Sequence, residues 1–302
     1  MKRGDLSAFL ALCVVLLAAR AALAERVYVA PETYLDEAQA IVIGKMTNVD
    51  AEEGTGEIAV TDMVRGDKEL RHVAARFGKR PKPQGGVALI MEDGPVTYEE
   101  GQEGIWLLRP RDRDEHGTYD LGEYHLFYDL DQLDHLKETM AALEKLPWGE
   151  PVGGLAARTL VHAPPWPNQR LIYVAVKNVS EKPLRISDYI GHRALAVTLV
   201  LPDGTEQPIE LYEFLQRVKL KAPEQKDYPV LAPGDVRYVG FWAGISTGNL
   251  TLKGVYRVKA SYSNADKGGA VLGYDVAWTG TVNAPEVTFE YVPAEAPGTP
   301  VP

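Results

Sequence analysis

Apolar residues fall in short runs along most of the chain, and residues that favour turns, mainly Gly, Pro, Asn and Asp, separate these runs. Val, Ile and Thr are frequent within the runs, and in several of them apolar and polar positions alternate. Both features are typical of β-strands bounded by turns, so the pattern predicts an all-β or mainly-β protein. In the first half, strands are expected at Val27–Ala30, Ala40–Thr47, Gly56–Val64, His72–Phe77, Gly86–Met91, Gly104–Leu108 and Tyr119–Tyr128.

Two segments of the first half have helical character. Residues Pro31–Ala38 predict one or two helical turns. In Asp131–Leu146, apolar residues recur at spacings of three and four, with acidic residues early and Lys145 late, as the helix dipole favours. We expect an amphipathic helix that closes the first half, with an apolar face formed by Leu133, Leu136, Met140 and Leu143.

The second half carries further strand patterns with short turns between them. Gly254–Tyr262 alternates cleanly, and Ala194–Leu201 ends in a Pro-Asp-Gly turn. About seven strands with short turns are typical of an immunoglobulin-like β-sandwich. Residues 207–220 fit either a helix or a strand. The expected strands include Leu171–Asn178, Ala194–Leu201, Val236–Trp242, Gly254–Tyr262, Trp278–Val282 and Val287–Tyr291.

The first 24 residues have the order of a secretory signal peptide. Lys2 and Arg3 are positive, Ala8–Ala19 is apolar, and Ala22–Ala24 is an A-x-A cleavage site. We expect cleavage after Ala24, and a secreted or periplasmic protein with no membrane insertion afterwards. The alternative is an uncleaved membrane anchor, but the apolar run is too short to span a bilayer comfortably.

Net charge is distributed unevenly along the 302-residue chain, whose total is −10. Residues 25–147 carry 14 Lys and Arg against 26 Asp and Glu, whereas residues 148–302 carry 15 of each. Between them, the Pro- and Gly-rich stretch 146–154 interrupts periodic structure. We therefore expect an acidic domain at 25–147, a neutral β-sandwich at 148–292 and a disordered, Pro-rich tail at 293–302.

Composition excludes several classes of protein. The single cysteine, Cys13, lies in the signal segment, so the mature chain would contain none. This excludes a disulfide framework and a cysteine-built zinc site, and disulfide-free export is commoner in bacteria than in animals. The acidic balance, with a pI near 5.2, argues against nucleic acid or an anionic membrane as the main partner.

The order of three segments in the acidic half carries a resemblance. AQAIVIGKMTNV is followed by IAVTDMVRGD and then by VTYEEGQEGIWLLRP. This order resembles the tissue-inhibitor-of-metalloproteinase-like (netrin-type) OB-fold modules of secreted bacterial proteins. The resemblance covers about 120 residues, which is one of the two domains that the chain length suggests. The resemblance implies an OB-like β-barrel. Inhibition of metalloproteinases in animal relatives uses an N-terminal cysteine, whereas Glu25 would be first here, so only the fold is carried over.

A second resemblance covers the neutral half. The segments LAPGD, GVYRVKASYSN and WTGTV are similar to those of bacterial immunoglobulin-like domains of secreted proteins. Three tryptophans, Trp166, Trp242 and Trp278, belong to this half. Buried tryptophans are common in such sandwiches, which favours the core over a sugar-stacking platform.

A charged run in the first half is a candidate calcium loop. Asp112, Asp114, Asp120 and Glu123 fit the spacing of an EF-hand loop, except that His116 occupies the fifth ligand position. The flanking segments have strand patterns, where an EF-hand has helices. The alternative is a charged hairpin loop without a metal, and the residue pattern leaves both open.

The other motifs favour structural roles. Gly244–Gly248 matches G-x-S-x-G, but every histidine precedes its serine, so the chain order of a hydrolase triad is absent and a turn is favoured. Asp131 and His135 share a helix face, yet zinc needs three or four ligands. Arg65–Asp67 is an RGD tripeptide, interpreted as a strand-end turn rather than an adhesion motif. The pair Glu99–Glu100 could supply the two carboxylates of a glycosidase, but neighbouring carboxylates are expected by chance in so acidic a domain.

Together these features predict a non-catalytic protein with no cofactor or metal. We expect it to bind an extracellular or envelope protein of unknown identity. One alternative is a carbohydrate-binding module that uses exposed Trp166 or Trp242. Another is a hydrolase with its site between the two halves.

Overall fold

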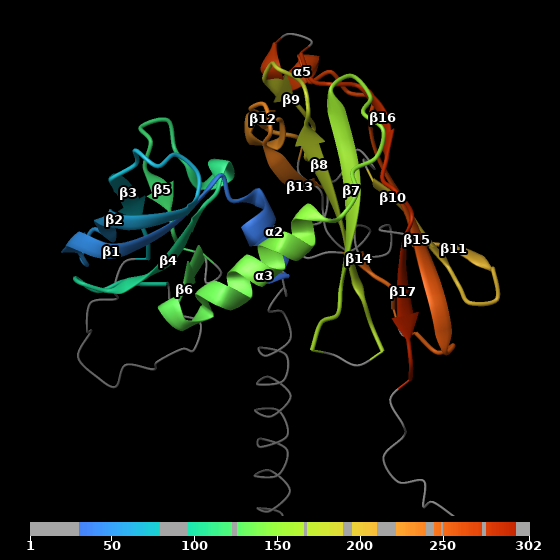
Figure 1. Ribbon diagram of the computed structural model, residues 1–302. Helices are drawn as coiled ribbons and strands as arrows, with labels where there is room; N and C mark the ends of the chain where they lie inside the picture. Colours follow the sequence, from blue (N-terminus) through green and yellow to red (C-terminus); the bar gives the residue numbers. More distant parts are fainter. Residues whose placement is uncertain are drawn as a thin grey trace, which may run out of the picture.

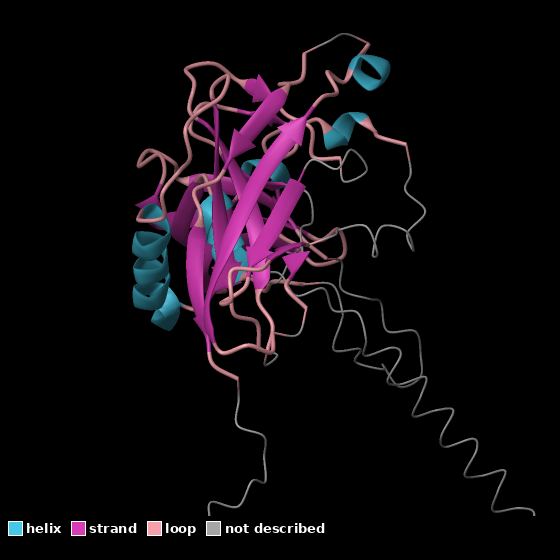
Figure 2. Ribbon diagram, turned by 90° about the vertical axis from the view of Figure 1, so that its right-hand side faces the viewer, coloured by secondary structure: helices cyan, strands magenta, loops and turns pink. Residues whose placement is uncertain are grey.

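The computed structural model describes residues 30–78, 96–122, 126–165, 168–189, 195–209, 222–239, 245–248, 250–273 and 276–293. Strands dominate these ranges and the helices are few and short (Figures 1 and 2), which confirms the expectation of a mainly-β protein. Several predicted features lie outside the described residues: the signal peptide, the strand at Gly86–Met91, the Pro-rich tail, most of residues 207–220, Glu123, Trp166 and Trp242. No helix in the described ranges is long and apolar enough to cross a membrane.

The first half forms one six-stranded sheet in the order β5-β3-β2-β1-β4-β6. Its pairings are antiparallel except that of β3 with β5. The elements are α2 (Pro31–Glu37), β1 (Ala40–Asp50), β2 (Thr55–Arg65), β3 (His72–Arg76), β4 (Glu103–Leu108), β5 (Tyr119–Asp120), β6 (Phe127–Tyr128) and α3 (Leu133–Glu144), with 3-10 turns at Pro110–Asp112 and Leu130–Gln132.

The two edges of this sheet are neighbouring pieces of one chain segment. Strand β5 pairs with β3 at one edge, and β6, a few residues later, pairs with β4 at the other. The sheet must therefore curl so that its edges approach, as in an OB-like barrel. The expectation of one continuous strand at Tyr119–Tyr128 is wrong, because this segment serves both edges as two short strands.

Aromatic rings fill the inside of the curled sheet. Trp106 is fully buried, and its ring centroid lies 4.6 Å from that of Phe127 and 4.9 Å from that of Tyr98. Gly104 lies beneath the Phe127 ring, where a Cβ atom would come within 2.1 Å of a ring carbon. Glycine is therefore required at this position to let the ring close the core.

The second half is built from two larger sheets that face each other. One contains β7 (Leu155–His162), β8 (Leu171–Asn178), β13 (Val236–Val239) and β14 (Ile245–Ser246), with β8 central. The other contains β10 (Leu195–Val200), β11 (Glu206–Pro208), β15 (Gly254–Asn264), β16 (Gly280–Asn283) and β17 (Val287–Tyr291). Smaller elements are β9 (Leu184–Arg185), β12 (Val230–Leu231), α5 (Gly269–Leu272) and a 3-10 turn at Gln225–Asp227.

Strand β8 is buried on both faces. Ile172, Val174 and Val176 point into the core between the two sheets. The alternate residues Leu171, Tyr173 and Ala175 belong instead to the core of the first half. Because successive side chains of a strand point to opposite faces, the continuous apolar run of β8 serves two cores at once. In Figure 1 the helices α2 and α3 lie between the barrel and this sheet.

Most expected strands coincide with observed ones, but β7 was not predicted. Its residues Leu155–Leu160 are buried without interruption, so they lack the alternation that marks a half-exposed strand. At Val236–Trp242 the strand β13 covers Val236–Val239, and the following residues lie outside the described ranges. The expected strand at Trp278–Val282 is shifted, because β16 begins at Gly280.

Candidate functional site

The short helix α2 lies at the seam, the contact surface between the first half (residues 30–147) and the second half (residues 148–293). Pro31 is at its first helical position, which suits the fixed backbone angle of proline. Its buried Tyr34 and Leu35 pack into the barrel core. The last turn carries Asp36 and Glu37, and both carboxylates contact the second half.

Glu37 is buried and contacts three groups, one in β13 and two in the segment that follows β4. Its Oε1 accepts a 2.7 Å hydrogen bond from the backbone N–H of Tyr238 in β13 and forms an ion pair with Arg111. Its Oε2 lies 3.7 Å from Nη1 of Arg109. Arg109 also holds Asp112 through two bonds of 2.6 and 2.9 Å, and its guanidinium lies 4.3 Å from the centre of the Tyr34 ring.

Asp36 forms the second arm of this network. It pairs with the buried guanidinium of Arg158 in β7 and accepts a 2.7 Å hydrogen bond from the Tyr238 hydroxyl. Burial, together with the charge of Asp36, raises the pKa of Tyr238 well above its ordinary value. Arg158 also donates to the carbonyl of Leu143 at 2.7 Å and lies over the Trp148 ring.

This network joins the halves and closes part of an open sheet edge. Among the described strands β13 pairs with β8 alone, and the N–H and C=O groups of Tyr238 face the first half. Glu37 accepts from that N–H, and Arg111 lies 3.5 Å from that carbonyl oxygen. Two side chains thus satisfy backbone groups that a neighbouring strand would otherwise bind.

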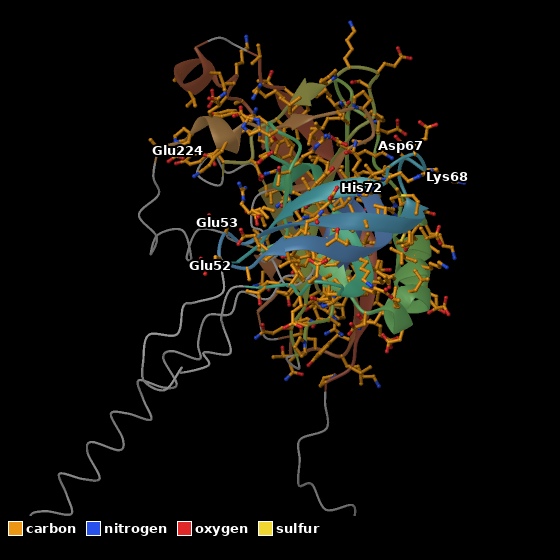
Figure 3. The ribbon with its side chains drawn as sticks, turned by 90° about the vertical axis from the view of Figure 1, so that its left-hand side faces the viewer. Glu52, Glu53, Asp67, Lys68, His72 and Glu224 are labelled. Atoms are coloured by element: carbon orange, nitrogen blue, oxygen red, sulfur yellow. The ribbon has the colours of Figure 1, made fainter. Side chains whose placement is uncertain are left out.

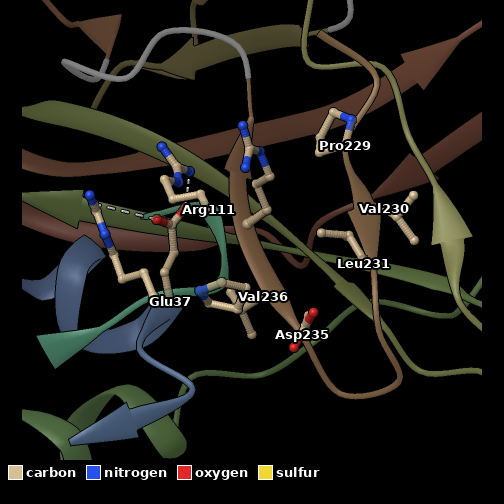
Figure 4. Close-up of a pocket in the computed structure, with 10 residues that line it drawn as sticks. Glu37, Arg111, Pro229, Val230, Leu231, Asp235 and Val236 are labelled. Atoms are coloured by element: carbon tan, nitrogen blue, oxygen red, sulfur yellow. Dashed lines mark hydrogen bonds and ion pairs between the residues drawn. The ribbon is translucent and has the colours of Figure 1, made fainter. Parts of the chain in front are cut away.

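A pocket of about 220 Å³ opens beside this closed edge (Figure 4). Glu37 and Arg111 lie on one side of it, and Pro229, Val230 and Leu231 lie on the other. The lining is completed by Arg109, Pro110, Asp235, Val236 and Arg237.

Two arginines of the pocket keep unused donors. Arg111 bonds Glu37 and Tyr238 through Nη2 alone, and Arg237 bonds Asp188 at 2.7 Å through Nε and Nη2. The remaining N–H groups of these two guanidinium groups have no partner among the described residues. Burial raises the pKa of Asp235, partly offset by a hydrogen bond from the N–H of Ala232.

A second, more open pocket of about 410 Å³ adjoins the first, and Pro110 and Asp235 line both. Its other walls include Arg113 and Asp114 from the charged run and Gln39 from the segment after α2. We call the two pockets together the seam groove. It runs between residues 109–117 of the first half and residues 229–237 of the second.

Another polar pair crosses the seam at the start of α2. The carboxylate Oε1 of Glu32 lies 3.0 Å from Nδ1 of His162 in β7. Burial by itself raises the pKa of Glu32, but the hydrogen bond and charge of His162, with a contribution from His135, outweigh this and lower it. The buried hydroxyl of Tyr128 has no hydrogen-bond partner among the described residues, and burial raises its pKa to about 12.

Of the candidate calcium residues, Asp112, Asp114 and Asp120 lie within the described ranges, and each has protein partners. Asp112 is bound by Arg109. Asp114 accepts from the N–H groups of His116 and Thr118, and Asp120 accepts from that of Gly122. In the described residues no group of three or more His, Cys, Asp or Glu side chains is placed to hold a metal. The run forms a turn between β4 and β5, and Asp114 supplies its cap.

The RGD tripeptide is tied into the fold. Arg65 donates to the carbonyl of Leu35 at 2.8 Å and lies 3.9 Å from the carboxylate of Glu144. Gly66 has a φ of +116°, and a Cβ there would meet the Cβ of Ala40 at 2.9 Å. The expected strand-end turn is therefore confirmed, and the arginine of the tripeptide is engaged inside the protein.

The remaining candidate residues from the sequence lie apart from the seam groove. The turn expected at Gly244–Gly248 is wrong at Ser246, which lies in strand β14 and whose hydroxyl accepts from the N–H of Gly248. Trp278 is buried, stacks on Tyr262 and donates to the carbonyl of Val152 at 3.0 Å. Asp131 and His135 are exposed. Glu99 and Glu100 line an open hollow, where Glu100 accepts from the N–H of Val49.

No family model matches the chain, and no curated protein is significantly similar to it. The seam network was not anticipated from the sequence. Its acidic members sit in a short helix, and their partners Arg158 and Tyr238 are far away along the chain. One available signal was the pair Arg109 and Arg111, which follows a buried strand.

Proposed function

We propose that this protein is a secreted, non-catalytic binding protein that contacts a polypeptide partner through the seam groove. The observation that carries the proposal is the way in which the buried charges are used. Asp36 is neutralised by Arg158 across the seam. Glu37 is neutralised by Arg109 within the first half and accepts a hydrogen bond from Tyr238 across the seam. These contacts fix the two β-rich halves together. The fixed halves then present the groove as one preformed surface, which lowers the cost of ordering on binding.

Surface charge supports a role in association. Many acidic side chains of the first half are exposed, among them Glu52 and Glu53 at the β1–β2 turn and Asp67 after β2 (Figure 3). The negative electrostatic field of these side chains accelerates encounter with a basic partner surface, and salt weakens this effect. The proposed export, with cleavage after Ala24, would place this surface outside the cytoplasm. N-terminal sequencing of the exported protein should give Glu25 as the first residue.

The two alternative functions have less support. A carbohydrate site based on the sandwich tryptophans loses one ring, because Trp278 is buried in the core. A hydrolase at the seam would need a nucleophile and a base. The described lining of the smaller pocket contains no Ser, Thr, Cys or His, and its Glu37 is held by arginines.

The test compares two matched surface variants of the mature full-length chain. Val230→Asp alters the groove wall, where Val230 is 47% exposed, and Val255→Asp alters β15, where Val255 is 56% exposed. Immobilised wild-type protein and both variants are incubated with envelope extract and culture fluid of the producing organism. We expect a protein retained by wild type and by Val255→Asp but not by Val230→Asp. Equal retention by all three would refute the groove as the contact surface.

A further inference from the structure

The open edge of β13 in the seam groove has room for only the end of a polypeptide chain. In this strand the backbone groups of every second residue face away from β8, so those of Val236 face away like those of Tyr238. At Tyr238 the edge is blocked by Glu37 and Arg111. At Val236, which lines the smaller pocket, it is not blocked by these side chains. A strand added beside β13 would therefore have to end before Tyr238.

The arginine side chains beside the blocked end of the β13 edge can bind a carboxylate. Beside the blocked end, Arg111 has N–H donors that no described residue binds, and Arg237 brings a second guanidinium to the same pocket. Guanidinium groups match the planar geometry of a carboxylate, and such charge-assisted hydrogen bonds are stronger than neutral ones. The anion that a polypeptide presents at its end is its terminal α-carboxylate.

Size and polarity point to the same occupant. The volume of about 220 Å³ is below that of typical pockets for drug-sized ligands, about 300–1,000 Å³. It suits a terminal residue rather than a cofactor. Opposite the arginines, Pro229, Val230 and Leu231 form an apolar wall for the side chain of that residue.

We propose that the smaller pocket of the seam groove binds the C-terminal end of an extended polypeptide of another protein, with its terminal carboxylate on Arg111 and Arg237 and an apolar last side chain against the 229–231 wall. This inference rests on the proposed binding function and names the part of the partner that is recognised. Val236 supplies the backbone hydrogen bonds beside the last residue.

The test uses two mixtures of N-acetylated tetrapeptides randomised at every position, one with free terminal carboxylates and one amidated. Each mixture is passed over the immobilised mature chain, and retained peptides are quantified by mass spectrometry. We expect the acid mixture to be retained about tenfold more than the amide mixture, because the amide lacks the charge. The retained acids should be enriched in apolar last residues.

Variants locate the site. Val230→Asp places a carboxylate in the exposed wall without opening the core, and it should abolish the preference for acids; Val255→Asp should leave it unchanged. Arg111→Gln should lower the preference for acids over amides, and circular dichroism checks that this variant is folded. Equal retention of acids and amides, or retention of neither, overturns the inference. So does displacement of the peptides by acetate at the same concentration, which would show a simple anion site. Val230-dependent capture of a protein without acid preference would leave the proposed function standing.

Discussion

The backbone N–H of Tyr238 donates to the carboxylate of Glu37 at 2.7 Å, although 201 positions separate the two residues in the chain. The same carboxylate oxygen binds Arg111, whose guanidinium also approaches the carbonyl of Tyr238. A side chain of the first half thus completes the hydrogen bonding of a strand in the second half. This relationship makes the seam part of the fold of each half.

Removal of the Glu37 charge should destabilise the whole protein. In Glu37→Gln the guanidinium group of Arg111 loses its carboxylate partner, and Arg109 keeps its pair with Asp112. Breaking a buried pair by removing one partner costs about 3–5 kcal/mol. Urea unfolding followed by fluorescence should report this loss, and hydrogen exchange at the Tyr238 amide should become faster.

The matched control is Glu206→Gln, because Glu206 pairs with Lys259 at the surface and both side chains are about half exposed. Exposed pairs of this kind contribute little to stability, so this variant should unfold close to the wild type. If Glu37→Gln unfolds at the same urea concentration as Glu206→Gln, the seam role assigned to Glu37 is wrong.

Asp36 and Arg158 should behave as one unit. The single variants Asp36→Asn and Arg158→Met each leave one buried charge without its partner. The double variant removes both charges, so its loss of stability should be smaller than the two single losses added together. A coupling of about 0.5–3 kcal/mol is typical of residues in one network. A double-mutant cycle by chemical denaturation measures it, and strictly additive losses would contradict the pairing.

A methyl group at Gly104 should disrupt the barrel core. In Gly104→Ala the new Cβ would meet the Phe127 ring at 2.1 Å and the carbonyl oxygen of Tyr128 at 2.8 Å. Overpacking of this kind costs about 1–3 kcal/mol or more. The comparison is Gly122→Ala, whose Cβ would meet only the Asp120 carboxylate at 3.1 Å. Thermal melts should show a clearly lower Tm for Gly104→Ala alone.

Stability should fall on acidification partly through Glu32. Its pKa in the folded protein lies below the ordinary value of 4.5, so the unfolded chain binds the proton more tightly. The contribution of Glu32 is fully present above that value and is lost as the pH falls through the lower, folded pKa. In Glu32→Gln, the decline of Tm between neutral and strongly acidic pH should be shallower.

The control for Glu32 is Glu103→Gln, since the Glu103 side chain is 59% exposed. Its pH profile should follow that of the wild type. A Glu32→Gln profile parallel to the wild type would show that the contact with His162 does not lower the pKa of this carboxyl group.

Much of the fold could be predicted from local patterns. β1, β2 and β15 are recognisable because β-branched residues, alternation and flanking turns agree, and α3 because leucines recur at helical spacing. β7 escaped prediction because both of its faces are buried and a charged residue, Arg158, lies in the middle of its apolar sequence. Burial on two faces removes the alternation on which strand prediction depends.

The candidate site could not be predicted in the same way. Asp36 and Glu37 are ordinary residues for the end of a short helix, and no local spacing connects them with Arg158 or Tyr238. The spacing of acidic residues in the run 112–123 predicted a set of candidate calcium ligands. The two arginines just before it, Arg109 and Arg111, prove to be partners of Glu37 in the seam network.

The double burial of β8 also sets the order in which the chain can fold. The Tyr173 hydroxyl of this strand accepts from the N–H of Ala30, 143 positions earlier. A polypeptide that emerges N-terminus first forms the hairpin of β1 and β2 early, but the flank of the barrel that packs on Leu171 and Tyr173 stays uncovered until β8 follows. Contacts of such long range slow folding and prolong the exposure of apolar surface. The N-terminal half therefore completes its own core only when most of the protein has been synthesised.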